Sequence, residues 1–378
     1  MKKVVVLGAG MVGSAIAADL SREYAVTSVD ADAIRLERLA AQHPIATHVA
    51  DLRDPAAVRG AVAGADLAVG AVPGYMGFAT LRTIIEAGVD VVDISFFPED
   101  PFELDALAQA QGVTAVVDAG VAPGLSNLVL GYEVSRLAAQ GVPVESFRCL
   151  VGGLPVQRTW PWQYKAPFSL VDVLEEYTRP ARLVEQGAVV TKPALSDPEL
   201  VEIEPVGTLE AFNTDGLRSL LKTMNVPNMA EKTLRYPGHI EYVRVLRNSG
   251  FLDTTPVQVG GAAVRPIDAA AAVLSEQWRL APGEPEFTVL EATVSARAAG
   301  SQPSLVYRLF DRTDAAGVSS MARTTGYTCT AIARLVLAGA FGQPGICPPE
   351  YVGAAPGCFE RVLADLAARG VVLHREEQ

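Results

Sequence analysis

The sequence contains few of the residues that build metal sites and disulfide frameworks. It has four cysteines and four histidines in 378 residues, and no two cysteines have CxxC spacing. Structural zinc sites use closely spaced cysteine and histidine ligands, so we expect no bound metal. Cys347 and Cys358 are near enough in the sequence to pair, but scattered cysteines are typical of a reducing compartment. We therefore expect free thiols and a cytoplasmic protein.

The sequence also lacks a cluster of basic residues and a long apolar segment. Its formal net charge is −12 and its isoelectric point is near 4.9. Surfaces that bind nucleic acids or anionic membranes need clustered lysine and arginine, so we expect neither partner. No run approaches the roughly eighteen apolar residues of a membrane-spanning helix. The first residues already form a predicted strand, which leaves no room for a cleavable signal sequence.

The sequence does contain a glycine-rich turn near its start. The apolar residues 4–7 predict a buried strand, and a GxGxxG pattern follows from residue 8 to residue 13. In such turns the first glycine allows the tight bend and the second lets the backbone approach a pyrophosphate. The third lets the following helix pack on the strand, and the helix N-terminus attracts phosphate. The predicted dinucleotide contacts here are Gly8, Gly10, Met11, Val12 and Gly13.

An acidic residue follows the second predicted strand, which covers residues 25–29. Asp30 lies 22 residues after Gly8, where a carboxylate accepts hydrogen bonds from the adenosine ribose and repels a 2′-phosphate. The sequence therefore favours NAD over NADP. The structural alternative is a strand-end aspartate near the helix that begins at Asp32. Arg35 is the nearby residue that would instead favour a 2′-phosphate.

Strands and helices continue to alternate as far as residue 124. Further strands are expected at 46–50, 67–72, 91–94 and 113–117. This alternation predicts a doubly wound parallel sheet, in which ligands bind at the carboxyl ends of the strands. Asp118 follows the sixth strand and is interpreted either as a catalytic residue or as a turn residue. The other residues expected to border the cofactor are Asp51, Leu52, Ala71, Val72, Pro73, Ser95, Gly120 and Pro123.

The pattern changes after residue 124, where the predicted parallel sheet ends. Strands separated by glycine turns predict an α+β domain with a mainly antiparallel sheet. Residues 159–165 combine aromatic residues, a proline and a lysine, which favours a loop lining a cleft. Helices are expected at 331–340 and 358–369, joined by a proline- and glycine-rich connector at 342–357. We expect these helices to pack back on the first domain. We thus expect three parts, residues 1–124, 125–325 and 326–378.

Several motifs spread over nearly the whole chain resemble the saccharopine dehydrogenase family, and within it the lysine 6-dehydrogenases most closely. They lie at residues 8–13, 118–124, 151–155, 168–169, 175–181, 214–216 and 235–239. The resemblance implies a Rossmann domain, a substrate domain inserted before the last helices, and a homodimer.

The resemblance also implies a reaction. A carbon bearing an amine would transfer a hydride to NAD, which gives an imine. In lysine 6-dehydrogenases the ε-amine of L-lysine is oxidised, ammonia is released, and the 2-aminoadipate 6-semialdehyde cyclises to piperideine-6-carboxylate. The alternatives are a saccharopine reductase or a carboxynorspermidine-type dehydrogenase, which join an amine to an aldehyde. A more remote alternative is a regulator that binds NAD without turnover.

An amino-acid substrate needs partners for its carboxylate and its amine. A guanidinium binds a carboxylate in a bidentate manner, and Arg235 is the first candidate for this role, with Arg179 second. Asp215 and Glu176 are the candidates for the amine. Structural ion pairs or helix caps are the alternative roles for these four residues. Tyr164, in the aromatic loop, is a further expected substrate contact.

Two residues are candidates for the proton acceptor. His239 is favoured because an unperturbed imidazole has a pKa near 6.5. A buried structural histidine is the alternative. Lys165 is the rival base, because the neighbouring Trp160 and Trp162 would desolvate its ammonium and lower its pKa.

Overall fold

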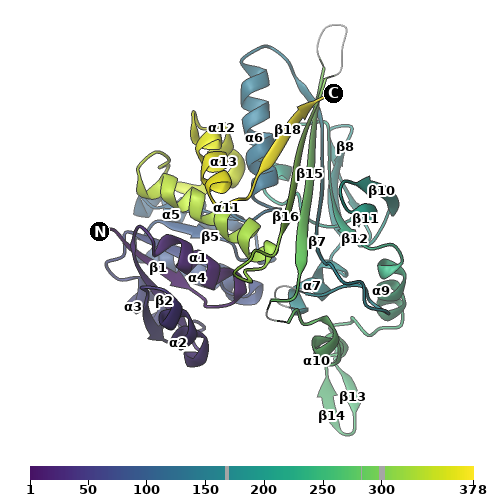
Figure 1. The fold of residues 1–378 in the computed structure, drawn as a ribbon, viewed down its shortest axis with the longest axis horizontal. Coiled ribbons are helices and arrows are strands. Elements are labelled where there is room, and N and C mark those ends of the chain that lie inside the picture. Colours follow the sequence, from purple (N-terminus) through teal and green to yellow (C-terminus); the bar gives the residue numbers. More distant parts are fainter. Residues whose placement is uncertain (167–169, 282, 298–302) are drawn as a thin grey trace. The chain divides into compact units, whose positions relative to one another are not determined.

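The computed structural model describes residues 1–166, 170–281, 283–297 and 303–378, and it divides the chain into two compact units (Figure 1). The first unit contains Met1–Gly141 and Met321–Val372. The second contains Val142–Ser320 and Leu373–Gln378. Residues 168–169, which form part of the family resemblance, lie outside the described residues.

The first unit is built on a parallel sheet of seven strands in the order β17-β6-β5-β4-β1-β2-β3. Apart from β17, this is the doubly wound order that places a dinucleotide at the carboxyl end of β1. The six strands expected from the sequence are all present, so the predicted Rossmann sheet is confirmed. Their bounds are β1 Lys3–Leu7, β2 Ala25–Asp30, β3 Ala46–Val49, β4 Leu67–Gly70, β5 Val91–Asp93, β6 Thr114–Val116 and β17 Gly345–Cys347.

Helices connect these strands, and α2 and α3 begin with aspartate caps. The side chain of Asp32 accepts from the first amides of α2, and Asp54 does the same for α3, which also begins with Pro55. The helices of this unit are α1 Met11–Leu20, α2 Ala33–Gln42, α3 Pro55–Val62, α4 Gly74–Glu86, α5 Asp105–Gln111, α6 Leu125–Ala138, α11 Ser320–Leu337, α12 Pro349–Ala354 and α13 Cys358–Ala368.

The first unit extends to Gly141 instead of ending at 124, because α6 packs closely on α12. A Cβ on Gly131 would lie 2.1 Å from the carbonyl oxygen of Glu350, and one on Gly353 would lie 2.2 Å from that of Leu128. Glycine on both helices permits this close approach. The expected loop between 342 and 357 therefore contains both β17 and α12.

The second unit is built on a sheet of nine strands, ordered β10-β11-β12-β7-β15-β16-β18, with β8 and β9 attached through β12. All neighbours are antiparallel except β12 and β7, which confirms the predicted mainly antiparallel sheet. The final strand was not expected, so the tail does not consist of helices alone. The strands are β7 Val144–Pro155, β8 Ala181–Glu185, β9 Ala188–Lys192, β10 Glu199–Ile203, β11 Gly207–Asn213, β12 Asn228–Arg235, β15 Glu286–Ala296, β16 Ser304–Arg312 and β18 Leu373–Glu377.

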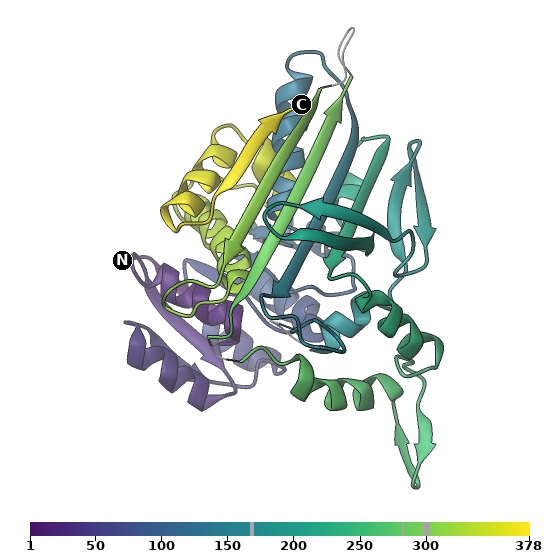
Figure 2. The same cartoon turned by 45° about the vertical axis from the view of Figure 1, so that its right-hand side comes forward.

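Helices cover part of one face of this second sheet. They are α7 Leu170–Glu176, α8 Leu220–Thr223, α9 His239–Asn248 and α10 Pro266–Trp278. The hairpin β13 Val257–Val259 with β14 Ala262–Val264 lies between α9 and α10 in the sequence and extends outward from these helices (Figure 2). Tyr177, Phe212 and Trp278 are fully buried in the core between the helices and the sheet. This core brings together the ends of α7 and β12 and the start of α9.

No helix among the described residues is both long and apolar enough to cross a membrane. Within the same residues, no group of three or more histidine, cysteine or acidic side chains is arranged to hold a metal ion. The four cysteines, Cys149, Cys329, Cys347 and Cys358, are free and buried, so the Cys347–Cys358 pairing does not form.

Candidate functional site

The glycine turn between β1 and α1 has the close contacts that only glycine permits. A Cβ on Gly8 would lie 2.3 Å from the carbonyl oxygen of Ala71, and one on Gly13 would lie 2.1 Å from the carbonyl oxygen of Gly8. A Cβ on Gly10 would meet no atom within 4 Å. The first and third glycines are therefore required by the fold itself. The second leaves open space beside the backbone, where a pyrophosphate fits.

The start of α1 suits an anion. Gly10 is its N-cap, no side chain caps the helix, and its first turn contains no acidic residue. Met11 is 42% exposed and Val12 is partly buried. The partial positive charge of a helix N-terminus is thus not neutralised by a local carboxylate. These features fit a dinucleotide held by the turn and the first turn of α1.

Asp30 supports this turn from the end of β2. Its Oδ2 accepts a hydrogen bond from the Ala9 amide at 2.6 Å, and its Oδ1 accepts one from the Asp32 amide at 2.8 Å. Asp32, not Asp30, caps the next helix and pairs with Arg35 at 3.0 Å. Asp51, which follows β3, is paired with Arg53 at 2.7 Å. Each nearby arginine therefore already has a carboxylate partner.

The other residues expected at the nucleotide have varied positions. Leu52 packs in the hydrophobic core of the first unit, and Val72 is buried there as well. Pro73 is exposed and is the N-cap of α4. Ser95 is buried after β5 and donates its amide to Asp93 at 2.6 Å.

Asp118 lies directly after β6 in a backbone conformation that is uncommon for aspartate. Its φ is 54° and its side chain is buried. A loop follows in which the Leu125 amide donates to the carbonyl of Gly120 at 2.9 Å. A Cβ on Gly120 would lie 3.1 Å from the carbonyl oxygen of Pro123. Strain at a non-glycine residue often marks a functional position, which keeps Asp118 among the candidates.

The second unit contains a buried guanidinium surrounded by tyrosines. Arg235, at the end of β12, is 4% exposed. Its Nε donates to the Tyr177 hydroxyl at 2.9 Å, its Nη1 to the Leu234 carbonyl at 2.9 Å, and its Nη2 reaches the Tyr164 hydroxyl at 3.5 Å. The guanidinium carbon also lies 4.4 Å from the centre of the Tyr164 ring. The predicted Arg235 and Tyr164 are thus neighbours.

Arg235 has no ion-pair partner within 4 Å among the described residues. Its three contacts are to neutral groups and leave further N–H donors on the guanidinium. Burial lowers its pKa, but Tyr177, Tyr164 and the carboxyl of Glu176 outweigh this and raise it. The guanidinium therefore stays charged. A buried charge without a counterion is costly, which makes this position a candidate anion site.

His239 is not placed as a base exchanging protons with solvent. It is 1% exposed at the start of α9, where its Nδ1 lies 2.8 Å from the Trp162 carbonyl and its Nε2 lies 3.0 Å from the Tyr177 hydroxyl. Burial, with the charge of Arg235, lowers its pKa to about 3. The expectation of a pKa near neutrality is therefore wrong, because the sequence does not reveal this burial.

Two carboxyl groups of the second unit have pKa values raised by burial. Glu176, at the end of α7, is partly buried, and its pKa rises to about 7 although Arg235 opposes the rise. Glu231, on β12, is buried, and its pKa also rises to about 7. The Thr214 hydroxyl donates to Glu231 at 2.6 Å. No ion pair or hydrogen bond holds Glu176 among the described residues.

The remaining predicted side chains are placed differently. Asp215 is bound by Arg182, whose Nε and Nη2 donate to its two oxygens at 2.9 and 2.8 Å. Its carboxylate is thus part of an ion pair. Arg179 lies 3.7 Å from Glu175, one turn earlier.

Lys165 is only partly buried, and the aromatic enclosure expected around it does not form. Trp160 is 77% exposed, and Trp162 packs against Trp278 with ring centres 5.4 Å apart. The desolvation on which the lysine hypothesis depended is therefore incomplete.

Sequence reasoning did not single out Tyr177, Glu231 or Trp278 as site residues. Tyr177 lies within the 175–181 motif, and Glu231 lies within a polar stretch, so both had a signal. Neither could be assigned because their partners are distant in the sequence: Tyr177 bonds a histidine 62 positions away.

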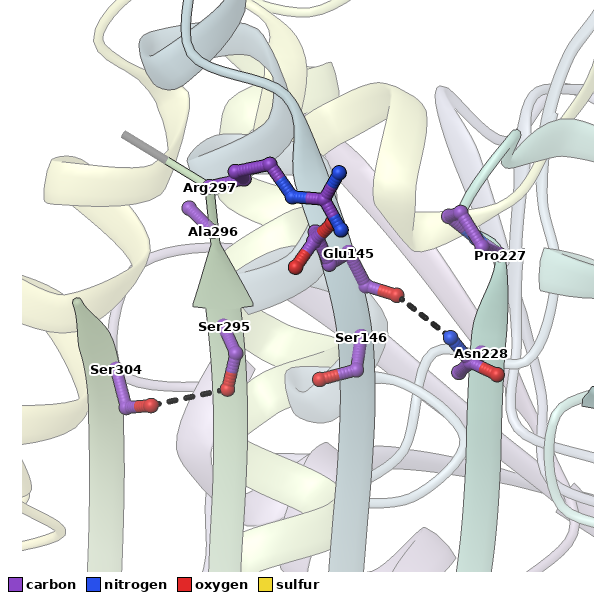
Figure 3. A pocket seen from close by; sticks show the side chains of 8 residues that line it. All are labelled: Glu145, Ser146, Pro227, Asn228, Ser295, Ala296, Arg297 and Ser304. Carbon is purple, nitrogen blue, oxygen red and sulfur yellow. Dashed lines mark hydrogen bonds and ion pairs between the residues drawn. The ribbon is translucent and has the colours of Figure 1, made fainter. Parts of the chain in front are cut away.

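A polar pocket of about 570 Å³ lies on the nine-stranded sheet of the second unit, at the end of the sheet opposite to Arg235 (Figure 3). It is formed where β7 and β12 begin, where β15 ends and where β16 begins. Arg297 forms an ion pair with Glu145, and the hydroxyls of Ser295 and Ser304 are 2.9 Å apart. Arg235 lies at the other end of β12, about 23 Å along the strand from Asn228, so this pocket is separate from the candidate site.

Comparison with known proteins agrees with the fold. Residues 4–116 match the family model described as the saccharopine dehydrogenase NADP binding domain, and residues 120–371 match that of the saccharopine dehydrogenase C-terminal domain. Together these matches cover most of the chain. The chain belongs to the saccharopine dehydrogenase family, as the sequence motifs indicated.

Individual relatives are more distant. The chain is 27% identical over 213 residues to saccharopine dehydrogenase [NADP(+), L-glutamate-forming] of Pyricularia oryzae, covering 53% of this chain and 47% of that protein. It is 26% identical over 266 residues to the protein of the same name from Schizosaccharomyces pombe, covering 68% and 59%. The chain thus spans about half the length of these relatives.

A solved structure shares the whole fold. Saccharopine dehydrogenase (L-Glu forming) from Saccharomyces cerevisiae superimposes with a TM-score of 0.82 and 20% identity, covering 100% of both chains. This likeness supports the α/β architecture.

Proposed function

We propose that this chain is a pyridine-nucleotide-dependent dehydrogenase that oxidises a carbon–nitrogen bond of an amino-acid substrate. The observation that carries the proposal is Arg235, a buried guanidinium with no carboxylate within ion-pair distance among the described residues. A substrate carboxylate would supply the missing charge and accept the unused N–H donors. Family membership supports the redox class.

Glu176 is the partner that we assign to the substrate amine. It lies close enough to Arg235 for the two charges to influence each other, and no hydrogen bond or ion pair within 4 Å holds it among the described residues. A carboxylate and a guanidinium at neighbouring positions match the two charges of an amino-acid zwitterion. Because its pKa is about 7, Glu176 is also able to exchange a proton near neutral pH.

Saccharopine is the first substrate that we propose, because the relatives are named for it. The nucleotide supplies the hydride acceptor when bound. The ε-carbon on the lysine side of the secondary amine loses a hydride, and the nitrogen loses its proton, which gives an imine. Addition of water to the imine then releases L-glutamate and 2-aminoadipate 6-semialdehyde. In this scheme Arg235 holds one carboxylate.

Oxidation of the ε-amine of L-lysine is the second candidate, and one observation favours it. Saccharopine carries several carboxylates, whereas Arg235 is the single fully buried, unpaired guanidinium in the described part of the second unit. One such group matches the single carboxylate of lysine. The same imine chemistry would release ammonium in place of glutamate.

We further propose NAD as the preferred cofactor. Asp30, Asp32 and Asp51 gather carboxylates at the ends of β2 and β3, while Arg35 and Arg53 are each paired with one of them. A 2′-phosphate would meet this negative charge without a spare cation. The family model is nevertheless named for NADP, so the choice needs a direct comparison. The homodimer implied by the resemblance and the cytoplasmic location inferred from the scattered cysteines also belong to this proposal, and the mass in solution tests the former.

The test is nucleotide reduction, followed at 340 nm, with saccharopine, L-lysine, L-ornithine and carboxynorspermidine, each with NAD and NADP. Saccharopine-dependent reduction with stoichiometric glutamate supports the first reading, and lysine-dependent reduction with ammonium supports the second. Equal turnover with NADP would overturn the cofactor assignment. Nucleotide binding without reduction by any of these amines would contradict the proposed enzyme and favour a regulator.

A further inference from the structure

Four groups from separate parts of the second unit form a continuous chain of hydrogen bonds. The Arg235 Nε lies 2.9 Å from the Tyr177 hydroxyl, and that hydroxyl lies 3.0 Å from the His239 Nε2. The His239 Nδ1 in turn lies 2.8 Å from the Trp162 carbonyl. The groups come from β12, the residue after α7, the start of α9 and the loop before α7.

The chemistry of the groups gives this chain one direction. A backbone carbonyl only accepts, so the proton of a neutral His239 must lie on Nδ1 and point to Trp162. The Nε2 atom is then an acceptor, and the Tyr177 hydroxyl must donate to it. The tyrosine oxygen is left to accept from the Arg235 Nε–H. His239 remains neutral because burial depresses its pKa.

The opposite tautomer would break the bond to Trp162. With the proton on Nε2, the lone pair of Nδ1 would face the Trp162 carbonyl oxygen at 2.8 Å. The Tyr177 hydroxyl would then accept from both His239 and the Arg235 Nε–H, and its own proton would have no acceptor among these groups. The Trp162 carbonyl is therefore the group that selects the arrangement.

We propose that Tyr177 and His239 are positioning residues that fix the direction of the Arg235 guanidinium, with the Trp162 carbonyl selecting the required histidine tautomer. The role in substrate binding rests on the proposed function, in which Arg235 holds a carboxylate. The bonds of Nε to Tyr177 and of Nη1 to Leu234 hold the guanidinium at two atoms. Its remaining N–H groups then have a fixed orientation before the ligand arrives, which lowers the entropic cost of binding.

Nitrogen-15 NMR of the full chain tests the arrangement without any substrate. The chain has four histidines, and the spectrum of a His239→Phe variant identifies the His239 signals. We expect a neutral imidazole protonated on Nδ1 that does not titrate between pH 5.5 and 8.5. A proton on Nε2, or titration within that range, would overturn the proposal.

The exchange rate of the Arg235 Nε–H measures the positioning itself. We expect at least tenfold faster exchange in Tyr177→Phe and in His239→Phe than in the unmodified protein. Tyr236→Phe is the matched control, because its buried hydroxyl donates to the Pro155 carbonyl at 3.0 Å and lies outside the chain of bonds. It should leave the Arg235 signal unchanged. Equal exchange in Tyr177→Phe and the unmodified protein would contradict positioning.

Steady-state kinetics separates this inference from the proposed function. If Arg235 holds a substrate carboxylate, Tyr177→Phe should raise KM about tenfold and change kcat less than threefold. If exchange accelerates while KM is unaffected, the positioning pair stands and the carboxylate role of Arg235 fails. If exchange does not accelerate, the pair is not a positioning device, whatever the kinetics show.

Discussion

Arg334 Nη1, on α11, lies 2.9 Å from Asp19 Oδ2, on α1, and so joins residues that are 315 positions apart. Arg369 Nε donates to Oδ1 of the same carboxylate at 2.7 Å, and the Thr330 hydroxyl donates to Oδ2. Asp19 is 2% exposed. One buried carboxylate thus neutralises two cations from the tail of the chain and ties that tail to the first helix of the nucleotide-binding unit.

We expect Asp19→Asn to lower the free energy of unfolding by about 1–3 kcal/mol, because it removes the buried carboxylate that pairs with Arg334 and Arg369 and leaves these arginines only the partly exposed Glu23 and Asp365. Burial raises the pKa of Asp19, but the arginines and Thr330 outweigh it, and the pKa is lowered overall. The stabilisation is therefore present above the unfolded pKa and is lost as pH falls through the folded value. Urea unfolding at pH 7 measures the first effect, and a series from pH 5 down to pH 2 measures the second.

Asp32→Asn is the control for this prediction. Asparagine also caps helices, and the ion pair that is lost, with Arg35, is exposed on both sides. Its effect should stay below about 1 kcal/mol. An equal loss of stability in the two variants would refute the buried-pair argument.

The glycine turn offers a matched pair of substitutions. Gly13→Ala would place a methyl group 2.1 Å from the Gly8 carbonyl oxygen, so we expect a loss of about 1–3 kcal/mol in stability. Gly10→Ala meets open space, and its stability should change by less than about 0.5 kcal/mol. Its methyl group nevertheless occupies the position of the pyrophosphate, so the nucleotide Kd should rise at least tenfold. Calorimetry measures both quantities, and unchanged nucleotide affinity in Gly10→Ala would exclude this turn as the site.

The raised pKa of Glu231 predicts that the free energy of unfolding depends on pH. Burial raises its pKa in the folded state to about 7, above the usual 4.5, so the protonated form is favoured in the folded state. The corresponding stability is present below the unfolded pKa and is lost as pH rises through 7. Glu231→Gln removes this dependence. Its stability relative to the unmodified protein should increase by about 2–3 kcal/mol between pH 5 and pH 8.5. A difference independent of pH would show that Glu231 is ionised throughout.

Glu176 predicts the pH dependence of substrate binding. The carboxyl ionises near pH 7, so affinity for an amino-acid substrate should increase from pH 6 to pH 8. In Glu176→Gln this increase should disappear, and KM at pH 8 should rise about tenfold, which corresponds to about 1.4 kcal/mol. Glu185→Gln is the control, because this carboxylate of the same unit is exposed and pairs with Lys192. A KM profile in Glu176→Gln that still follows pH would assign the titration to another group.

The sequence predicted those parts of the fold that have strong local patterns. The strands β1 and β4 are uninterrupted apolar runs between turns, so their burial follows from their composition. The strands β17 and β18 were not predicted, each for a different reason. Residues 345–347 form a short strand next to prolines and glycines, and residues 373–377 are charged and exposed at the edge of a sheet. Only tertiary pairing identifies them.

The candidate site was predicted in its residue types but not in its contacts. Arg235 and His239 belong to one sequence motif, and the fold places Tyr164 next to both of them. The state of His239 was not predictable, because it depends on Trp162, which is 77 positions away, and on burial beneath α10. Asp215 was equally ambiguous, since its ion pair with Arg182 forms across 33 positions.

The division of the chain has a consequence for its synthesis. The polypeptide passes from one unit to the other after residues 141, 320 and 372. The seven-stranded sheet is incomplete until β17 has been made, and β16 has an unpaired edge until residues 373–377 are added. The first unit therefore cannot finish folding on the ribosome before residues 345–347 have emerged, nor the second before residues 373–377 have emerged. Until then the exposed edge of β16 is a site for pairing with other chains, and residues 373–377 close it.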